Sequence, residues 1–130
     1  MNQAQNIKLS GAKAAGAKIA KLLQGGEILA LIGPLGAGKT TFVKALGKAL
    51  NIRQKIISPT FTLMRVLPFK LKGRQLYLYH LDLYRLRNFR DVRSLGLTEV
   101  WGRPETVAVI EWADKIKTHL PKKTRYIYFI

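Results

Sequence analysis

The fold of this chain is decided by one stretch, Gly33-Pro34-Leu35-Gly36-Ala37-Gly38-Lys39-Thr40. It fits the pattern G-x-x-x-x-G-K-[ST] and follows a short apolar run, residues 27–32, that is typical of a buried strand. Residues 39–50 carry apolar side chains at helical spacing. A glycine-rich turn between a strand and a helix directs successive backbone N–H groups and the positive end of the helix at one anion. The stretch therefore predicts a phosphate-binding loop.

The residue types in this loop suit a nucleotide with a metal ion. The Lys39 ammonium can reach the outer phosphates as a point charge, and the Thr40 hydroxyl can ligate Mg²⁺. The simpler alternative is a flexible turn that contains Lys-Thr by coincidence, but four fixed positions match by chance in well under ~1% of chains this long. We therefore expect ATP or ADP to be bound by Gly33, Gly36, Ala37, Gly38, Lys39, Thr40 and Thr41.

Two of the seven acidic residues lie where a nucleotide-hydrolysing site needs them. Asp82 and Glu111 each follow an apolar run directly, and the carboxyl ends of parallel strands share the edge that holds the ligand. They could hold the metal ion and orient a water molecule. The alternatives are a cap for the turn at 83–85 and a first-turn helix carboxylate. The other acids are expected in loops or helices or at the opposite strand end: Glu27, Asp91, Glu99, Glu105 and Asp114.

Five further side chains are weaker candidates for the same site. Ser58 and Thr60 belong to a Ser-Pro-Thr segment, an ordinary turn sequence whose hydroxyls could also reach the outer phosphate. His80 alternates with the acid two residues later and could point the same way, although a structural histidine is the simpler interpretation. Arg85 could act as an internal arginine finger or lie exposed on a helix. Trp112 is more typical of a core than of a nucleobase platform.

The rest of the chain alternates helix and strand signals, which predicts an α/β fold. A helical period runs from Ala12 to Leu23, with Ser10 as its cap. Residues 84–101 are typical of short helices and loops, and residues 112–120 of a helix. We expect one domain over residues 1–130, a P-loop fold with a mixed, largely parallel sheet and flanking helices. Its further strands are expected at 55–58, 61–67, 75–81, 107–110 and 125–130.

The composition narrows the class of protein. The 130 residues include 23 Lys and Arg but only seven Asp and Glu, a formal charge of +16, which favours an anionic partner without saying which. The absence of cysteine excludes disulfide frameworks, thiolate metal sites and cysteine nucleophiles. No apolar run approaches the roughly 18 residues of a membrane helix, and the first residues lack a signal-peptide pattern. We expect a cytoplasmic protein with no membrane partner.

Several motifs occur here in an order that resembles one family. They are the phosphate loop, residues 58–63 (SPTFTL), residues 80–86 (HLDLYRL), residues 95–97 (LGL) with Glu99, and residues 110–112 (IEW). The loop alone is shared by a vast superfamily, whereas the other motifs in this order are highly specific. From about Ser10 to its carboxyl end, the chain resembles the TsaE family, also called YjeE.

The resemblance implies a small P-loop ATPase that binds ATP and Mg²⁺, hydrolyses ATP weakly and depends on the partner proteins TsaB and TsaD. TsaD transfers the threonylcarbamoyl group to adenosine 37 of tRNA, so tRNA is implied as a partner through that complex. By position, Thr40 and Glu111 look like the magnesium ligands. Lys39 looks like the phosphate lysine, and Asp82 like the catalytic or water-orienting acid.

The resemblance also implies a switch-like loop at residues 58–60 and places Trp112 beside the site. The sequence departs from the family at Pro34, where Asp is usual, and at Lys13-Ala14, where an acidic residue and Thr are usual. The segment after Leu63 is basic, where the family is commonly acidic. Two other functions stay open on the residues alone. One is a small-molecule or nucleotide kinase, and the other is a basic RNA-binding module gated by nucleotide.

Overall fold

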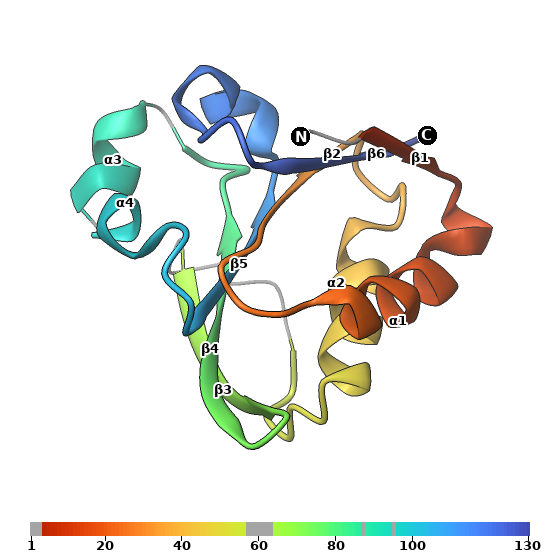
Figure 1. The fold of residues 1–130 in the computed structure, drawn as a ribbon. Coiled ribbons are helices and arrows are strands. Elements are labelled where there is room, and N and C mark those ends of the chain that lie inside the picture. The colour runs from red at the N-terminus through yellow and green to blue at the C-terminus, as the bar shows by residue number, and fades with distance from the viewer. Residues whose placement is uncertain (1–3, 57–63, 87, 95) are drawn as a thin grey trace.

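The structure, a computed structural model, describes residues 4–56, 64–86, 88–94 and 96–130. Its centre is a six-stranded sheet in the order β1-β6-β2-β5-β4-β3 (Figure 1). The first five strands in this order run parallel to their neighbours, and only β3 is antiparallel, to β4. The predicted mixed, largely parallel sheet is confirmed. The strands are β1 (Ala4–Ile7), β2 (Ile28–Ile32), β3 (Met64–Leu71), β4 (Arg74–Asp82), β5 (Thr106–Glu111) and β6 (Arg125–Phe129).

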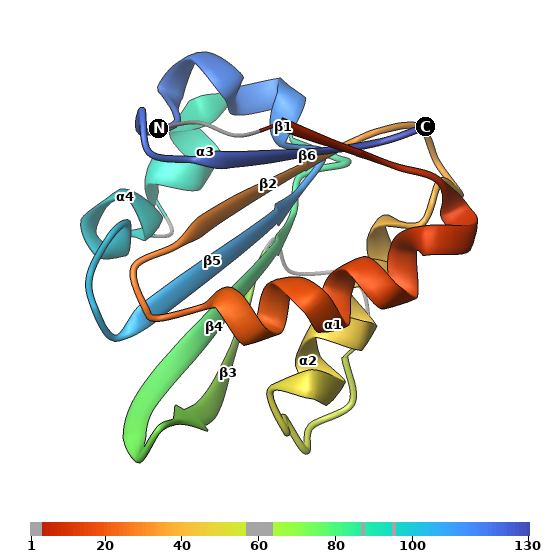
Figure 2. The ribbon, with the colours of Figure 1, turned by 45° about the vertical axis from the view of Figure 1, so that its right-hand side comes forward.

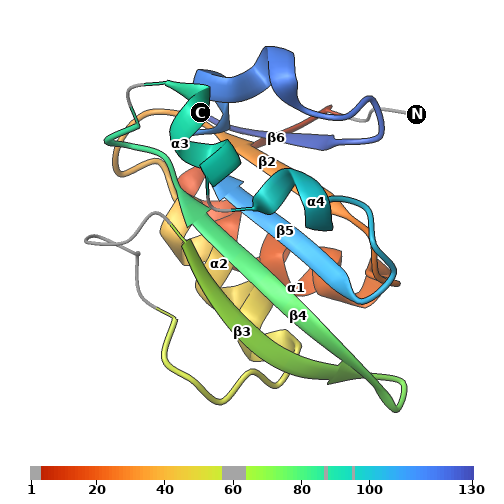
Figure 3. The ribbon, with the colours of Figure 1, turned by 90° about the vertical axis from the view of Figure 1, so that its left-hand side faces the viewer.

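Helices cover both faces of the sheet, as parallel strands require. In Figure 3, α3 and α4 lie in front of the sheet, while α1 and α2 lie behind it. Within the described residues, none of the helices has the length and apolar character that crossing a membrane requires. The helical elements are η1 (Leu9–Gly11), α1 (Ala12–Leu22), α2 (Lys39–Ala49), α3 (Phe89–Ser94), α4 (Leu97–Val100) and η2 (Ala113–His119), of which η1 and η2 are 3₁₀ helices.

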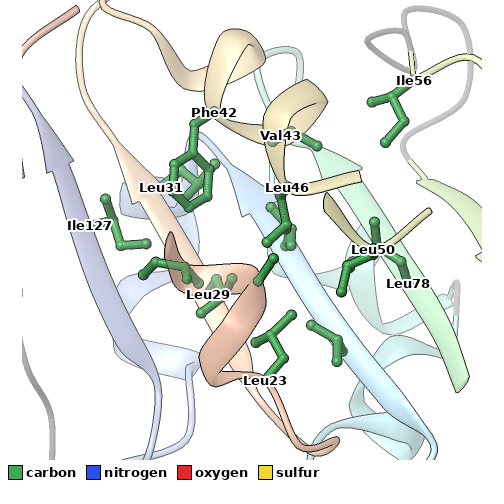
Figure 4. Close-up of a cluster of buried hydrophobic side chains, with 14 of the residues drawn as sticks. Leu23, Leu29, Leu31, Phe42, Val43, Leu46, Leu50, Ile56, Leu78 and Ile127 are labelled. Atoms are coloured by element: carbon green, nitrogen blue, oxygen red, sulfur yellow. The ribbon is translucent and has the colours of Figure 1, made fainter. Parts of the chain in front are cut away.

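The two faces of the sheet carry separate cores because successive strand residues point to opposite sides. In β2, Leu29 and Leu31 belong to the core under α1 and α2, whereas Ile28 and Ala30 belong to the core under α3 and η2. Figure 4 shows the first of these cores, in which side chains from α2 meet those of the central strands. This packing fixes the position of α2, and therefore of the loop before it.

Helix α2 ends as its sequence predicts. Lys44 and Lys48 are exposed, while Val43 and Leu46 on the other face are completely buried. Asn51 follows the helix with a positive φ of 58°, and the N–H of the next residue, Ile52, donates to the Gly47 carbonyl at 3.0 Å. This pairing satisfies a carbonyl of the last turn and is the usual way a helix stops at Asn or Gly.

Three predicted elements differ from the structure. Ser10 does not cap α1, because η1 intervenes and Gly11 occupies the cap position with no side-chain hydrogen bond. Of the strand predicted at 55–58, residues 55 and 56 are not in a strand and the others lie outside the described residues. Strand β1 was not predicted. Its four residues, Ala-Gln-Asn-Ile, have no alternating pattern, and β1 forms by parallel pairing with β6.

The segment after residue 63 forms a longer hairpin than predicted. Strand β3 runs to Leu71, and Lys72 and Gly73 form a two-residue turn with φ of 51° and 79°. Two positive φ angles are typical of the tight turns that match strand twist. Pro68 is tolerated within β3 because this strand is an edge of the sheet. The helix predicted at 112–120 is a kinked 3₁₀ segment, since Ile116 has non-helical angles.

Candidate nucleotide-binding site

The loop between β2 and α2 contains glycines at positions where a side chain would be crowded or the backbone has a positive φ. Gly38 precedes α2 with a φ of 112°, and a Cβ atom there would lie 3.0 Å from the Cβ of Ala12. A Cβ atom on Gly33 would lie 2.6 Å from the carbonyl oxygen of Phe129. Gly36 also has a positive φ, of 79°, but its surroundings are open. Packing by α1 and β6 therefore holds the loop in its curled shape.

Lys39 is folded into this loop. Its side chain is only 5% exposed, and Nζ donates to the carbonyl oxygens of Gly33 at 2.5 Å and Pro34 at 2.8 Å. The ammonium also lies 4.1 Å from the centroid of the Trp112 ring, an attractive cation–π geometry. Burial lowers the pKa of Lys39 below its ordinary value, and the carboxylate of Glu111, then those of Asp114 and Asp82, oppose that shift. Three acids therefore act on this one cation.

Glu111 is the buried carboxylate of the site. It is the last residue of β5 and is 2% exposed. His80 Nε2 lies 2.7 Å from Oε2 of Glu111, and because a carboxylate only accepts, the histidine donates. The other oxygen, Oε1, lies 3.4 Å from the Thr40 hydroxyl at the start of α2. The contact with His80 orients the Glu111 carboxylate so that its second oxygen faces the phosphate loop. Glu111 therefore ends a strand and does not belong to the first turn of a helix, which was the alternative.

Asp82 lies beside Glu111 at the same edge of the sheet. The two residues are partners in the parallel register of β4 and β5, as their positions after apolar runs predict. Oδ1 of Asp82 also accepts a hydrogen bond from the Tyr84 N–H at 3.0 Å. The turn-capping alternative is therefore observed as well, and this contact orients the Asp82 carboxylate.

The donor set suits a magnesium ion bound together with phosphate. The described residues contain no group of three or more His, Asp or Glu side chains that could hold a metal ion unaided. Magnesium in nucleotide sites takes one or two protein ligands and completes its shell with phosphate oxygens and water. The facing Thr40 hydroxyl and Glu111 carboxylate provide two oxygen donors of the preferred kind. The residues present therefore fit this ion.

Asp114 and the left-handed backbone of Trp112 affect the surroundings of Lys39 in ways that the sequence did not indicate. Asp114 was expected to be a solvated charge or to lie in the first turn of a helix. It is exposed in the first turn of η2, and its carboxylate also opposes the lowering of the Lys39 pKa. Trp112 adopts a left-handed conformation with φ of 59° and ψ of 39°. A bulky residue in this conformation is strained by about 1–3 kcal/mol. In this conformation the indole ring lies against the Lys39 ammonium.

Four predicted site residues remain: Thr41, Arg85, Ser58 and Thr60. Thr41 is exposed in the first turn of α2, next to the loop. Arg85 is exposed, as one alternative predicted, but it lies in the turn after β4 and not on a helix. Ser58 and Thr60 lie outside the described residues.

The chain is similar to known proteins. The chain matches the family described as "Threonylcarbamoyl adenosine biosynthesis protein TsaE" over residues 8–129. A "tRNA threonylcarbamoyladenosine biosynthesis protein TsaE" from Treponema pallidum is 44% identical over 110 residues, or 84% of this chain and 76% of that protein. A protein of the same name from Nostoc is 43% identical over 104 residues, or 78% of this chain and 61% of that protein.

A solved structure shares the fold. The crystal structure of Bacillus subtilis YdiB superposes with a TM-score of 0.67 at 31% identity, covering 93% of this chain and 71% of that one. The resemblance inferred from the order of the motifs is confirmed. Because the family match extends over nearly the whole chain and both of these relatives exceed 40% identity, the chain belongs to the TsaE family of threonylcarbamoyl adenosine biosynthesis proteins.

Proposed function

We propose that this chain is a P-loop ATPase that supports a TsaB–TsaD complex in threonylcarbamoyladenosine modification of tRNA. The observation that carries the proposal is the convergence of Lys39, Thr40 and Glu111 at one edge of the sheet. Such an edge, at the carboxyl ends of parallel strands and the N-terminus of a helix, is where anionic ligands bind in α/β proteins. Family membership supports the tRNA pathway.

In this proposal the backbone N–H groups of residues 36–40 bind the phosphates of ATP. Lys39 exchanges its contacts with the loop carbonyls for the outer phosphates, and the adjacent acids keep its ammonium charged as it moves. Thr40 and Glu111 hold Mg²⁺, which neutralises charge on the phosphate oxygens when bound. Asp82 orients the attacking water, and ADP and phosphate are the products. The partner proteins TsaB and TsaD raise a weak intrinsic rate.

Calorimetric titration with ATP and ADP tests nucleotide binding. We expect Lys39→Ala to raise the Kd for ATP about 30-fold or more, because a charge-assisted contact to phosphate contributes about 2 kcal/mol. Lys44→Ala is the matched control, since Lys44 is an exposed lysine on the same helix. The Kd of this variant for ATP should stay within twofold of that of the unmodified chain. The absence of heat with millimolar ATP and ADP for the unmodified chain would refute nucleotide binding.

The metal ligand is tested by Glu111→Gln with and without Mg²⁺. The amide keeps an oxygen for the His80 contact but removes the charge that a metal ion needs. We expect binding of MgATP to weaken about tenfold while binding of metal-free ATP is unchanged or slightly stronger, because a negative charge near the phosphates has gone. Equal losses under both conditions would indicate structural damage and contradict the assigned role.

A further inference from the structure

The charge of this protein is unevenly distributed along the chain. Residues 1–81 contain thirteen of the 23 basic residues but a single acid, Glu27. The Glu27 carboxylate accepts hydrogen bonds from the backbone N–H groups of Gln24 and Gly25, both at 2.8 Å, so it is engaged at its own turn. The amino-terminal part of the fold therefore carries a large positive charge with almost no compensation.

Part of this charge gathers around three adjoining surface hollows at the far end of α2. Their volumes are about 660, 480 and 260 Å³, and Asn51 lines all three. None of the residues that line them is acidic. We call this surface the basic face, and it is defined by the exposed side chains of Lys44, Lys48, Arg53, Lys55, Lys70 and Lys72.

The basic face is separate from the nucleotide-binding site. Helix α2 starts at Lys39 and ends at Ala49, so its eleven residues place the two ends about 16 Å apart. Figure 2 shows the far end of α2 beside the hairpin of β3 and β4. One hollow is accordingly lined by Asn51 from the end of α2 and by Lys70 from β3. A ligand on this face would leave the phosphate loop accessible.

The residue types on this face indicate the kind of partner. Protein interfaces have an apolar or aromatic centre and are depleted in lysine. Here five of the six basic side chains are lysines, and the aromatic residue lining the hollows, Phe69, is buried at 5% exposure. Apolar residues such as Ile52 and Ile56 also line the hollows, but these two are buried, and the charged side chains that line the hollows are all basic. A group of lysines around these hollows fits a polyanion whose charges are repeated along a backbone.

We propose that the basic face binds the phosphate backbone of RNA. The side-chain amides of Asn51 and Gln54 line the same hollow as the lysines and can donate to phosphate or ribose oxygens. No exposed aromatic side chain lines the three hollows, so bases have no ring on which to stack. The face therefore positions RNA without reading its sequence.

The test uses fluorescently labelled tRNA and the 130-residue chain. Fluorescence anisotropy should give a Kd that rises steeply between 50 and 200 mM salt, because each phosphate contact releases counterions. The double variant Lys48→Glu/Arg53→Glu should raise the Kd at least tenfold. It should also lower the slope of log Kd against log salt concentration by about two. A labelled RNA duplex of unrelated sequence should bind within threefold of tRNA.

The matched control reverses the same number of charges elsewhere. Arg90→Glu/Lys122→Glu changes two exposed residues outside the hollows. Its Kd for tRNA should rise less than threefold, and circular dichroism and calorimetry with ATP should show that both variants fold and bind nucleotide alike. Equal losses in the two variants would overturn the proposal, because attraction would then depend on total charge.

Two other results would also overturn it. One is the absence of tRNA binding by the unmodified chain at 50 mM salt. The other is a Lys48→Glu/Arg53→Glu variant that keeps its affinity for tRNA but loses affinity for polyglutamate, since the face would then accept an acidic protein. Binding of ATP in both variants keeps these outcomes distinct from failure of the proposed ATPase, because the nucleotide site lies at the other end of α2.

Discussion

Asp82→Asn should leave ATP binding unchanged and lower the rate of partner-stimulated ATP hydrolysis at least about 100-fold, the scale on which a positioned acid–base group contributes. Asparagine keeps an oxygen that can accept the hydrogen bond from the Tyr84 N–H, so the turn after β4 survives. What is lost is the negative charge beside Glu111 that can orient and deprotonate a water. The measurement is phosphate release with TsaB and TsaD present, alongside calorimetry with ATP.

Asp114→Asn is the matched control for this experiment. Asp114 is exposed and acts electrostatically on Lys39 more strongly than Asp82 does, but it follows β5 by three residues instead of ending a strand. We expect the hydrolysis rate of Asp114→Asn to stay within about threefold of that of the unmodified chain. If the two variants lost activity equally, Asp82 would act only through its electrostatic effect on Lys39, an effect that Asp114 shares. If Asp82→Asn kept the full rate, its proposed role would be wrong.

Phe42→Ala should lower the free energy of unfolding by about 3–5 kcal/mol, the cost of removing a fully buried aromatic ring. Phe42 is completely buried in α2, and its ring meets that of Phe129 edge to face at a centroid distance of 5.7 Å. The contact joins α2 to β6, whose Phe129 carbonyl also packs against Gly33. The midpoint of thermal unfolding should fall by roughly 10 °C or more.

Denaturant unfolding followed by circular dichroism measures this effect. Leu22→Ala is the control, because Leu22 is 53% exposed on α1 and surface substitutions usually change stability by about 0.5 kcal/mol or less. The loss of unfolding free energy for Phe42→Leu should lie between the losses for Phe42→Ala and Leu22→Ala. A loss below about 1 kcal/mol for Phe42→Ala would mean that the core under α2 is not packed as described. ATP should recover part of the lost stability, since ligand binding favours the folded state.

Local patterns in the sequence predicted the central strand β2, the loop after it and helix α2, because neighbouring residues in the sequence determine these elements. Within the run 27–32, residues 28–32 are all apolar, as a strand covered on both faces must be, and they form β2. The glycines of the phosphate loop and Asn51 mark positions with special backbone angles, and they bound α2 as predicted. The positions of Asp82 and Glu111 after apolar runs placed both at one strand edge.

Other features depend on residues far apart in the sequence, and local patterns could not predict them. Strand β1 has no signal of its own and exists because β6 offers it hydrogen bonds. The cap at Gly11 replaces the expected Ser10 because η1 turns the chain before α1 begins. Asp114 was expected to be a solvated or first-turn helix carboxylate, and only the fold lets its charge act on Lys39.

The phosphate loop, the α/β class and the family could be recognised from the order of residues, because each is encoded within short segments. The orientation of the Glu111 carboxylate toward Thr40 could not be recognised in this way, since it depends on His80 from the neighbouring strand. The gathering of the lysines of α2 and β3 on one surface likewise depends on the fold. Both are contacts between distant segments, and the packing of α2 on the sheet creates them.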